Sequence, residues 1–335
     1  MLSILVLTVM LTRLPDTCSN TTMYSTSQIK KLYDKFLIKY PRDFSKDMIS
    51  YRERLKIFQE NVYLIEKSNN ENSTATYEVT KFADWADEEL DAFSGSLSKP
   101  DRYVFRYSGH GWIHVVSDGS PYPSRWDWRE RGGVTAVKSQ SYKCNSCYAY
   151  AVTAVIESLL AIKYQQYIPL SEHEMLDCDY TNNGCESGSI MRSLERGKYI
   201  GYTQEVNYPT QLGNNYYCPL HGQIFVKKLY QIDPDPNAIA WFVANVAPVA
   251  SNLAFLKRYV FYKSGIIPGS SECSIMEPNH AAEVIGYGIE NGKKYWLLKN
   301  SWGEWWVQWG DQGFFKMERG INACQVETYV ASAGL

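Results

Sequence analysis

The eight cysteines constrain the possible folds of this chain more than any other feature. Whether they are disulfide-bonded or free depends on whether the protein is exported. They are Cys18, Cys144, Cys147, Cys178, Cys185, Cys218, Cys273 and Cys324. The first dozen residues are apolar, too few to span a bilayer but suited to the core of a signal peptide, which we predict over residues 1–19. Cysteines of an exported protein form disulfides. If Cys18 leaves with the signal, an odd number remains and at least one thiol stays unpaired.

A zinc site is the competing interpretation, because Cys144-x-x-Cys147 has the spacing of a ligand pair. A structural zinc needs four ligands, and no second close pair of Cys or His residues completes the set. Cys178 and Cys185, the nearest candidates, are seven residues apart. We therefore predict disulfides and a free thiol, with no metal.

Charge and composition exclude several kinds of partner. Hydrophobic residues make up 45% of the chain and charged residues 21%, as in a folded globular protein. The net charge of −2 gives no reason to expect nucleic acid or an anionic membrane surface as a partner. No stretch after the N-terminus is long and apolar enough to predict a membrane helix.

The residue composition and the spacing of apolar residues change along the chain. Apolar residues recur at helical spacing within residues 27–69, where Pro41 separates two predicted helices. Residues 94–124 are rich in Gly, Ser and Pro, which predicts an extended linker. A compact region begins near Trp126.

The compact region is predicted to be helical in its first half and β-rich in its second. Residues 147–161 contain no Gly or Pro, and they begin with several alanines, which predicts a long buried helix with Cys147 in its first turn. Residues 282–288 and 294–299 flank Glu290-Asn291-Gly292, a hairpin signal. A cleft between two such halves is a natural site.

Three residues could carry out nucleophilic chemistry. A thiol attacks a carbonyl as its thiolate, and a free cysteine titrates at about 8.5, so the anion needs stabilisation. The start of a helix and a nearby imidazolium both stabilise a thiolate. Cys147 opens a predicted helix, His280 can supply the imidazole, and the neutral amide of Asn300 can orient that ring. Taken alone, His280 is better explained as a core or loop histidine.

The surrounding motifs resemble the papain and cathepsin family of cysteine proteases. The run Cys144-Asn145-Ser146-Cys147-Tyr148 is similar to the family's nucleophile signature. The other matching motifs are Asp127-Trp128-Arg129, Val134-Thr135-x-Val137-Lys138-Ser139-Gln140, Leu170-Ser171-Glu172-x3-Leu176-Asp177-Cys178, Asn183-Gly184-Cys185, Asn279-His280-Ala281, Gly286-Tyr287-Gly288 and Tyr295-Trp296-x2-Lys299-Asn300-Ser301-Trp302-Gly303. Upstream, Arg54-x3-Phe58-x2-Asn61-x3-Ile65-x3-Asn69 resembles the helical motif of cathepsin L-like propeptides, with Ser50 where that motif begins with Glu.

The resemblance covers the chain from about residue 27 to its end and implies an α+β, papain-like two-lobed fold. The left lobe would be helical with a long central helix, the right lobe would resemble a β-barrel, and a helical pro-segment would precede both. The implied domains are a signal peptide (1–19), an inhibitory propeptide (20–120) and a papain-like peptidase domain (121–335). Cleavage around residues 115–123 would convert the zymogen.

The resemblance also implies residue roles. Cys147 would be the nucleophile, His280 the general acid and base, Asn300 the residue that orients it, and Gln140 a donor of the oxyanion hole. Substrate would contact Gly188, Ile190, Pro278, Trp302 and Tyr329. The implied disulfides pair Cys144 with Cys185, Cys178 with Cys218, and Cys273 with Cys324, which leaves Cys147 as the free thiol.

The implied function is that of a cysteine endopeptidase that acts through a thioester acyl-enzyme and needs no cofactor. It would be a monomer of the secretory pathway, lysosomal or extracellular. Its expected partners are protein or peptide substrates, its own propeptide as an intramolecular inhibitor, and cystatin-type inhibitors.

Several positions depart from the family pattern. Asn145 replaces a glycine, Tyr148 replaces the usual tryptophan, and Ser187 replaces another glycine. The segment between Gln140 and Cys144 is one residue longer than usual, and residues 303–310 hold about three extra. These changes keep open a second hypothesis, a catalytically weak or inactive homologue with a binding role. The retained Cys147 and His280 favour the enzyme, and the motif set excludes a purely structural disulfide-rich protein.

Overall fold

The computed structural model describes most of the chain. The described residues are 24–71, 73–94, 97, 111–141, 144–209, 218, 221–303 and 309–335. The predicted signal peptide, with Cys18, lies outside them, as do Tyr142, Lys143 and residues 304–308. The chain forms two compact units, Met1–Asp43 and Phe44–Leu335.

In the first unit the structure describes one helix, α1 (Thr26–Lys39). Ser25 precedes the helix and accepts a hydrogen bond from the backbone N–H of Gln28 through its hydroxyl. The side chain of Gln28 accepts one in return from the backbone N–H of Ser25, at 2.7 Å. This reciprocal capping satisfies backbone donors that have no partner inside the helix, and it fixes where α1 begins.

The second unit opens with helix α2 (Tyr51–Asn69), which Ser50 and Glu53 cap in the same reciprocal way. The two helices predicted on either side of Pro41 are thus confirmed. Ser50, which departs from the propeptide motif, is the residue that starts α2. Two short elements follow, strand β1 (Thr76–Tyr77) and helix α3 (Asp87–Ser94).

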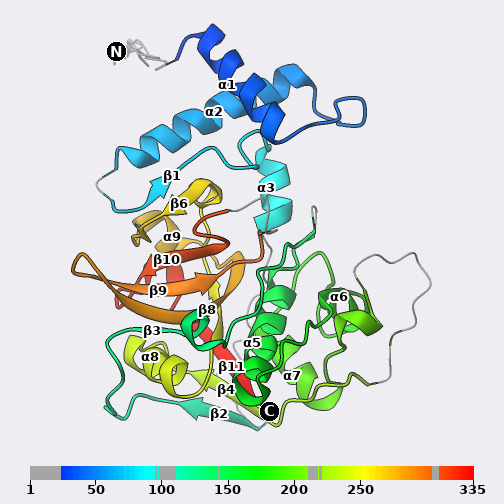
Figure 1. The fold of residues 1–335 in the computed structure, drawn as a ribbon, viewed down its shortest axis with the longest axis vertical. Coiled ribbons are helices and arrows are strands. Elements are labelled where there is room, and N and C mark those ends of the chain that lie inside the picture. Colours follow the sequence, from blue (N-terminus) through cyan, green and yellow to red (C-terminus); the bar gives the residue numbers. More distant parts are fainter. Residues whose placement is uncertain are drawn as a thin grey trace, which may run out of the picture. The chain divides into compact units, whose positions relative to one another are not determined.

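Helix α5 (Cys147–Tyr164) is the central helix of the second unit. Its residues from Cys147 to Ala161 are all buried, which confirms the predicted buried helix with Cys147 in its first turn. It packs against the sheet on one side and against α6 (Glu172–Cys178) and α7 (Ile190–Tyr199) on the other (Figure 1). Contrary to the sequence expectation, α5 among the described helices is long and apolar enough to cross a membrane, but 83% of it is buried inside the protein, as in a core helix.

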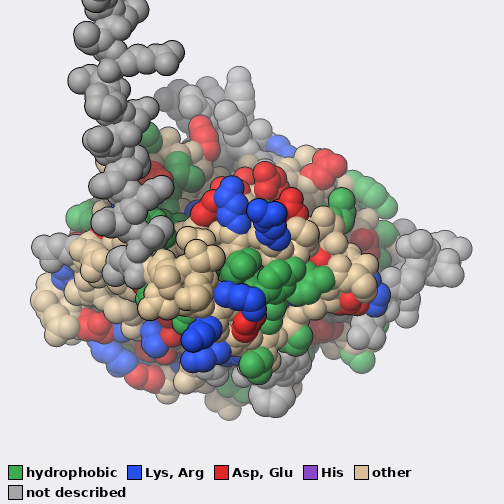
Figure 2. All heavy atoms as spheres, turned by 90° about the horizontal axis from the view of Figure 1, so that it is seen from above, with side chains coloured by type: hydrophobic (Ala, Val, Ile, Leu, Met, Phe, Trp, Pro, Cys, Tyr) green, Lys and Arg blue, Asp and Glu red, His purple; other side chains and the backbone are tan. Residues whose placement is uncertain are grey.

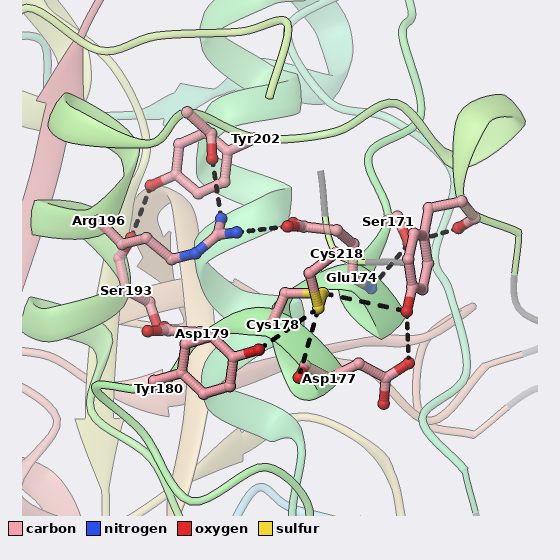
Figure 3. A network of polar contacts seen from close by, with 12 residues as sticks. Ser171, Glu174, Asp177, Cys178, Asp179, Tyr180, Ser193, Arg196, Tyr202 and Cys218 are labelled. Carbon is pink, nitrogen blue, oxygen red and sulfur yellow. Dashed lines mark hydrogen bonds and ion pairs between the residues drawn. A yellow bond between two sulfur atoms is a disulfide. The ribbon is translucent and has the colours of Figure 1, made fainter. Parts of the chain in front are cut away.

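Helices α6 and α7 are joined by a buried ion pair that Figure 3 shows from close by. The guanidinium of Arg196 on α7 contacts the carboxylate of Glu174 on α6, and both side chains are 1% exposed. Arg196 also donates to the carbonyl of Gly201 at 2.8 Å, and Tyr202 donates to the carbonyl of Ser193 at 2.9 Å. These contacts hold α7, which begins two residues after Gly188, in a fixed position.

The β-rich half is one nine-stranded sheet. Strands run in the order β2-β4-β11-β5-β8-β9-β10-β7, and β3 pairs with β8. Their bounds are β2 (Trp112–Val115), β3 (Trp126–Asp127), β4 (Lys228–Ile232), β5 (Val249–Leu253), β7 (Ile266–Ile267), β8 (His280–Glu290), β9 (Lys293–Lys299), β10 (Phe314–Glu318) and β11 (Tyr329–Gly334). The hairpin between β8 and β9 is confirmed, and Asn291 and Gly292 have the positive φ angles that its tight turn needs. A separate two-stranded sheet joins β1 to β6 (Tyr262–Ser264).

Short helices complete the described structure. They are η1 (Trp128–Arg131), η2 (Glu205–Asn207), α8 (Pro236–Asn245), η3 (Lys257–Phe261), α9 (Ser271–Ile275) and η4 (Ala323–Gln325).

Strand β2 lies within residues 94–124, which the sequence predicts to be an extended linker. Trp112–Val115 pairs in parallel with β4 along four residues, so part of the linker is an edge strand of the sheet. The Trp112 side chain is 7% exposed and belongs to the core cluster around α5. Gly, Ser and Pro are frequent in residues 94–124, but the pairing with β4 and the buried Trp112 ring fix this part of the segment to the sheet.

The face drawn in Figure 2 carries basic and acidic side chains next to one another, around a small group of apolar side chains. On this face, charges of one sign do not gather into an extended field.

Candidate active site

Cys147 is the first residue of α5 and its side chain is completely buried. The disulfide between Cys144 and Cys185 ties the preceding loop to the chain before α7. This loop and the start of α5 place the sulfur at the positive end of the helix dipole, which favours a thiolate.

His280 and Asn300 meet at the edge of the sheet next to that helix. His280 is the first residue of β8 and Asn300 follows the last residue of β9, so the hairpin brings them together. The ring Nε2 of His280 lies 2.8 Å from the amide Oδ1 of Asn300. That oxygen also accepts a hydrogen bond from the backbone N–H of Ser301, which fixes the amide orientation. An oxygen facing Nε2 requires the proton on Nε2, so Nδ1 is the nitrogen that can accept one.

The Cys147 sulfur lies beside the start of β8. The backbone of Ala281, the residue after His280, hydrogen bonds to the thiol, and so does the backbone of Tyr148. Burial raises the pKa of the Cys147 thiol to about 12, because a thiolate without solvation is costly, and these hydrogen bonds lower it only in part. Among the described cysteines Cys147 is the free thiol. The others form the pairs Cys144–Cys185, Cys178–Cys218 and Cys273–Cys324, as the resemblance implies.

Aromatic rings enclose the His280–Asn300 contact. The Trp302 ring lies 4.9 Å from the His280 ring and is 0% exposed, and the Phe255 ring lies 5.1 Å from His280 on centroid distances. A hydrogen bond kept away from water in this way is stronger than an exposed one.

Both the carbonyl and the amide group of the Gln140 side chain form hydrogen bonds. Its carbonyl Oε1 accepts a hydrogen bond of 2.6 Å from the hydroxyl of Ser301. Its amide Nε2 donates to the backbone carbonyls of Phe93, at 2.5 Å, and of Cys144, at 3.3 Å. The sequence motif contains Ser301 but gives no hint of this role, which only the folded structure reveals. Because Ser301 contacts both Gln140 and Asn300, it orients two residues of the predicted site at once.

The N-terminal segment occupies the site through Phe93 and Leu97. Phe93 is in the last turn of α3, and its ring lies 5.4 Å from Trp302, 5.2 Å from Phe82 and 5.3 Å from Trp85. Leu97 forms a parallel β-bridge with Gly188. The described residues of this segment therefore contact the predicted site at Trp302 and at Gly188.

Tyr148 explains why residue 188 is a glycine. The buried Tyr148 ring lies under Gly188, where an added Cβ would come within 2.4 Å of the ring. The Tyr148 hydroxyl donates to the carbonyl of Gly184 at 3.1 Å. The tyrosine that departs from the family pattern thus supports the backbone predicted to pair with substrate.

The remaining predicted substrate contacts come from separate elements. Ile190 is the buried first residue of α7, Pro278 is buried two residues before His280, and Tyr329 is the half-buried first residue of β11. Their joint role in a specificity pocket stays a prediction.

Comparisons with known proteins agree with this arrangement. The model of the family "Papain family cysteine protease" matches residues 122–333, and that of "Cathepsin propeptide inhibitor domain (I29)" matches residues 33–90. The viral cathepsin of Choristoneura fumiferana nuclear polyhedrosis virus is 34% identical over 92% of this chain and 93% of its own length. That of Autographa californica nuclear polyhedrosis virus is 33% identical over 94% of this chain and 95% of its own.

Solved structures show the same fold. Digestive procathepsin L2 from the larval midgut of Tenebrio molitor matches with a TM-score of 0.81 and 27% identity, over 92% of this chain and all of its own. A recombinant stem bromelain precursor matches with a TM-score of 0.77 and 29% identity, over 92% of this chain and 99% of its own. The predicted papain-like α+β fold is confirmed. The chain belongs to the papain family of cysteine proteases, as a cysteine-type peptidase with a cathepsin propeptide inhibitor domain.

Proposed function

We propose that this peptidase is an endopeptidase zymogen that cleaves peptide bonds with Cys147, His280 and Asn300. The 2.8 Å contact between His280 and Asn300, beside the buried Cys147 thiol, is the observation that carries the proposal. The order of the chemistry follows from the proton positions. Nδ1 of His280 takes the thiol proton, and the resulting ion pair supplies a thiolate nucleophile.

The thiolate then attacks the carbonyl carbon of the scissile bond. The oxyanion that forms accepts hydrogen bonds from the Gln140 side-chain amide and from the backbone N–H of Cys147. The C–N bond breaks as the imidazolium gives its proton to the leaving amine, which leaves a thioester on Cys147. A water molecule loses a proton to His280, attacks the thioester carbon, and releases the carboxylic acid while the thiol regains its proton.

Inhibition by the propeptide rests on the position of Phe93. Its carbonyl already bonds to Gln140, so the proposed oxyanion donor is occupied. Leu97, which follows the helix, pairs with Gly188 through a parallel β-bridge, at the backbone proposed to pair with substrate. The segment therefore contacts the site at two points, the Gln140 amide and Gly188. We assign the propeptide to residues 20–120 and the peptidase domain to residues 121–335.

We place the protein in the secretory pathway, as a lysosomal or extracellular enzyme. The apolar N-terminal residues support this, and so do three disulfides, which form and persist in oxidising compartments.

The test is to mature the zymogen at acid pH and to assay it with a peptide substrate and an epoxide thiol inhibitor. We expect turnover, inhibition, and one covalent adduct on Cys147 by peptide mass mapping. Cys147→Ser should show neither turnover nor adduct. Matured protein with no turnover and no adduct on Cys147 would instead favour an inactive homologue with a binding role.

A further inference from the structure

Five charged residues, four of them buried and the fifth, Lys138, partly buried, lie around α5 and the β8–β9 hairpin, behind the proposed site. We name them the charge cluster: Lys138, Glu157, Glu172, Glu283 and Lys299. The ammonium of Lys138 lies 2.8 Å from Glu157 and 2.9 Å from Glu172. The Lys299 ammonium donates to the Thr135 hydroxyl at 2.9 Å, and that hydroxyl donates to Glu157 at 2.6 Å.

The charge cluster connects the segments that carry the proposed nucleophile, its base, the residue that orients the base, and the oxyanion donor. Lys138 precedes Gln140 by two residues, Glu157 is on α5 with Cys147, Glu283 is on β8 with His280, and Lys299 immediately precedes Asn300. Glu283 and Lys299 are directly paired in the β8–β9 ladder. A cavity of about 20 Å³, enough for about one water molecule, lies between the cluster and the site. Its lining includes Lys138, Glu157, Lys299, Asn300 and Ser301.

The charge cluster holds three carboxyl groups and two ammonium groups, and Glu283 is the carboxyl with the weakest compensation. Its Oε1 accepts a hydrogen bond from Ser158 at 2.7 Å, while its Oε2 is buried with no hydrogen-bond partner. The nearest cation, Lys299, is 4.0 Å away. An ionised carboxylate that is fully buried with one unpaired oxygen is unfavourable, so Glu283 is the group that retains a proton.

The titration behaviour agrees with this geometry. Burial raises the pKa of Glu283 most, Lys299 and the Ser158 hydroxyl oppose the rise, Glu157 adds to it, and the resulting pKa is about 7. Burial also raises the pKa of Glu172, but Lys138 and the hydroxyl of Thr153, at 2.6 Å, stabilise its ionised form.

The other elements that pack against β8 add no further charge near Glu283. Strand β5 and helix α8 contain no titratable side chain. On β3, Asp127 pairs with the chain further along β8 at Gly286, and Arg129 of η1 binds its carboxylate at 2.8 Å.

We propose that Glu283 is a positioning residue for the catalytic site. While the Glu283 carboxyl is neutral, Lys299 stays bound to Thr135. When the carboxyl ionises, it draws Lys299 away from Thr135. This inference rests on the Cys147–His280–Asn300 chemistry proposed above. In this structure Lys299 holds Thr135 at hydrogen-bond distance, 2.9 Å, while Glu283 lies 4.0 Å away, so closing the second distance requires Lys299 to move. A shift of Lys299 moves the end of β9, and Asn300 is the next residue. The His280 ring then loses its fixed orientation as the pH rises through neutrality.

The test compares kcat and KM of matured wild type and Glu283→Gln between pH 5 and pH 8.5. If only enzyme with a neutral Glu283 is fully active, kcat of the wild type should fall to about one tenth of its low-pH value at one pH unit above the pKa of Glu283. Glu283→Gln is neutral at every pH, so we expect it to match wild type within about twofold at pH 5 and to exceed it several-fold at pH 8. KM should change little in either protein. Glu290→Gln, on the far end of the same strand, is the matched control and should follow wild type.

A second variant tests the direction of the lysine shift. Thr135→Val removes the hydroxyl that competes for Lys299, so it should move the alkaline fall of kcat to lower pH than in wild type. If Glu283→Gln does not fold, this variant alone decides. Superimposable pH profiles for wild type and the variants would overturn the inference. Because every comparison uses enzyme that turns over at pH 5, such a result leaves the proposed peptidase function intact.

Discussion

The side-chain amide of Gln140 donates a hydrogen bond to the backbone carbonyl of Phe93, 2.5 Å away. One bond therefore joins the proposed oxyanion donor of the enzyme to the end of helix α3, which we assign to the propeptide. The same donor would serve inhibition in the zymogen and catalysis in the mature enzyme. Substitution of Phe93 should therefore affect maturation, and substitution of Gln140 should affect turnover.

Phe93→Ala should weaken inhibition by the propeptide. The Phe93 ring is buried against Trp302, Phe82 and Trp85, and truncating a buried phenylalanine typically costs about 3–5 kcal/mol. We expect the variant zymogen to mature faster at acid pH and to show activity at a pH where the wild-type zymogen shows none. Tyr63→Ala, which changes an exposed aromatic residue on α2, is the control. Equal maturation rates for all three proteins would contradict the assigned role of Phe93.

Gln140→Ala should lower kcat of the matured enzyme by about 10²–10³ with little change in KM, the usual effect of losing one oxyanion donor. Ser301→Ala should cause a smaller loss, because it removes only the hydroxyl that orients the Gln140 amide. Alkylation of Cys147 by iodoacetamide forms no oxyanion, so its rate serves as the control and should remain unchanged in Gln140→Ala. If alkylation falls as much as turnover, the substitution has damaged the nucleophile rather than the oxyanion hole.

Local sequence pattern predicts the elements of the site well. An Ala-rich run without Gly or Pro predicts a buried helix that begins at Cys147, and Asn-Gly between two apolar runs predicts the hairpin that carries His280 and Asn300. Each signal lies within a few residues of the feature it predicts.

Contacts between distant segments escape the same reasoning. The Gln140–Phe93 bond joins residues 47 positions apart, and the Gln140–Ser301 bond joins residues 161 apart. Glu283 gave one local signal, a charged residue inside the apolar run that forms β8. Its partners Ser158 and Lys299 come from other elements, so the sequence could show that Glu283 was unusual but not what it contacts.

Arg54→Met should destabilise the zymogen. The Arg54 guanidinium is buried and contacts Asp47 at 2.7 Å, Glu89 at 2.6 Å and the carbonyl of Asp84 at 2.8 Å. The substitution removes the buried cation that contacts Asp47 and Glu89, and breaking a buried ion pair costs about 3–5 kcal/mol. We expect a large fall in the melting temperature, measured in a Cys147→Ser background to prevent processing. Lys56→Met, on the exposed side of the same helix, should leave the melting temperature nearly unchanged.

The Cys147 thiol should be unreactive in the zymogen and reactive after maturation. A folded-state pKa of about 12 means that at pH 8 only about one thiol in ten thousand is ionised. We expect removal of the propeptide to admit water to the site, and since burial is the main cause of the raised pKa, the pKa of the thiol should fall. Iodoacetamide alkylation, followed by mass spectrometry across a pH series, measures both states. A zymogen that is alkylated as fast as the matured enzyme would contradict the burial of the thiol by the propeptide.

Glu283 should make the folded protein more stable in acid than at neutral pH. Its pKa is raised in the folded state, from 4.5 to about 7, so the folded state binds the proton more tightly than the unfolded state. The stabilisation by this proton is complete below about pH 4.5, is lost as the pH rises towards 7, and changes no further above that. Over this window the free energy of unfolding should fall by about 3 kcal/mol in wild type relative to Glu283→Gln.

Urea unfolding of the Cys147→Ser zymogen at pH 4, 5.5, 7 and 8, with and without Glu283→Gln, measures that difference directly. Other titrating groups contribute equally to both proteins and cancel in the comparison. A difference between the two that stays constant across the series would mean that Glu283 carries the same charge in the folded and unfolded states. In that case neither its burial nor its distance from Lys299 would affect its protonation.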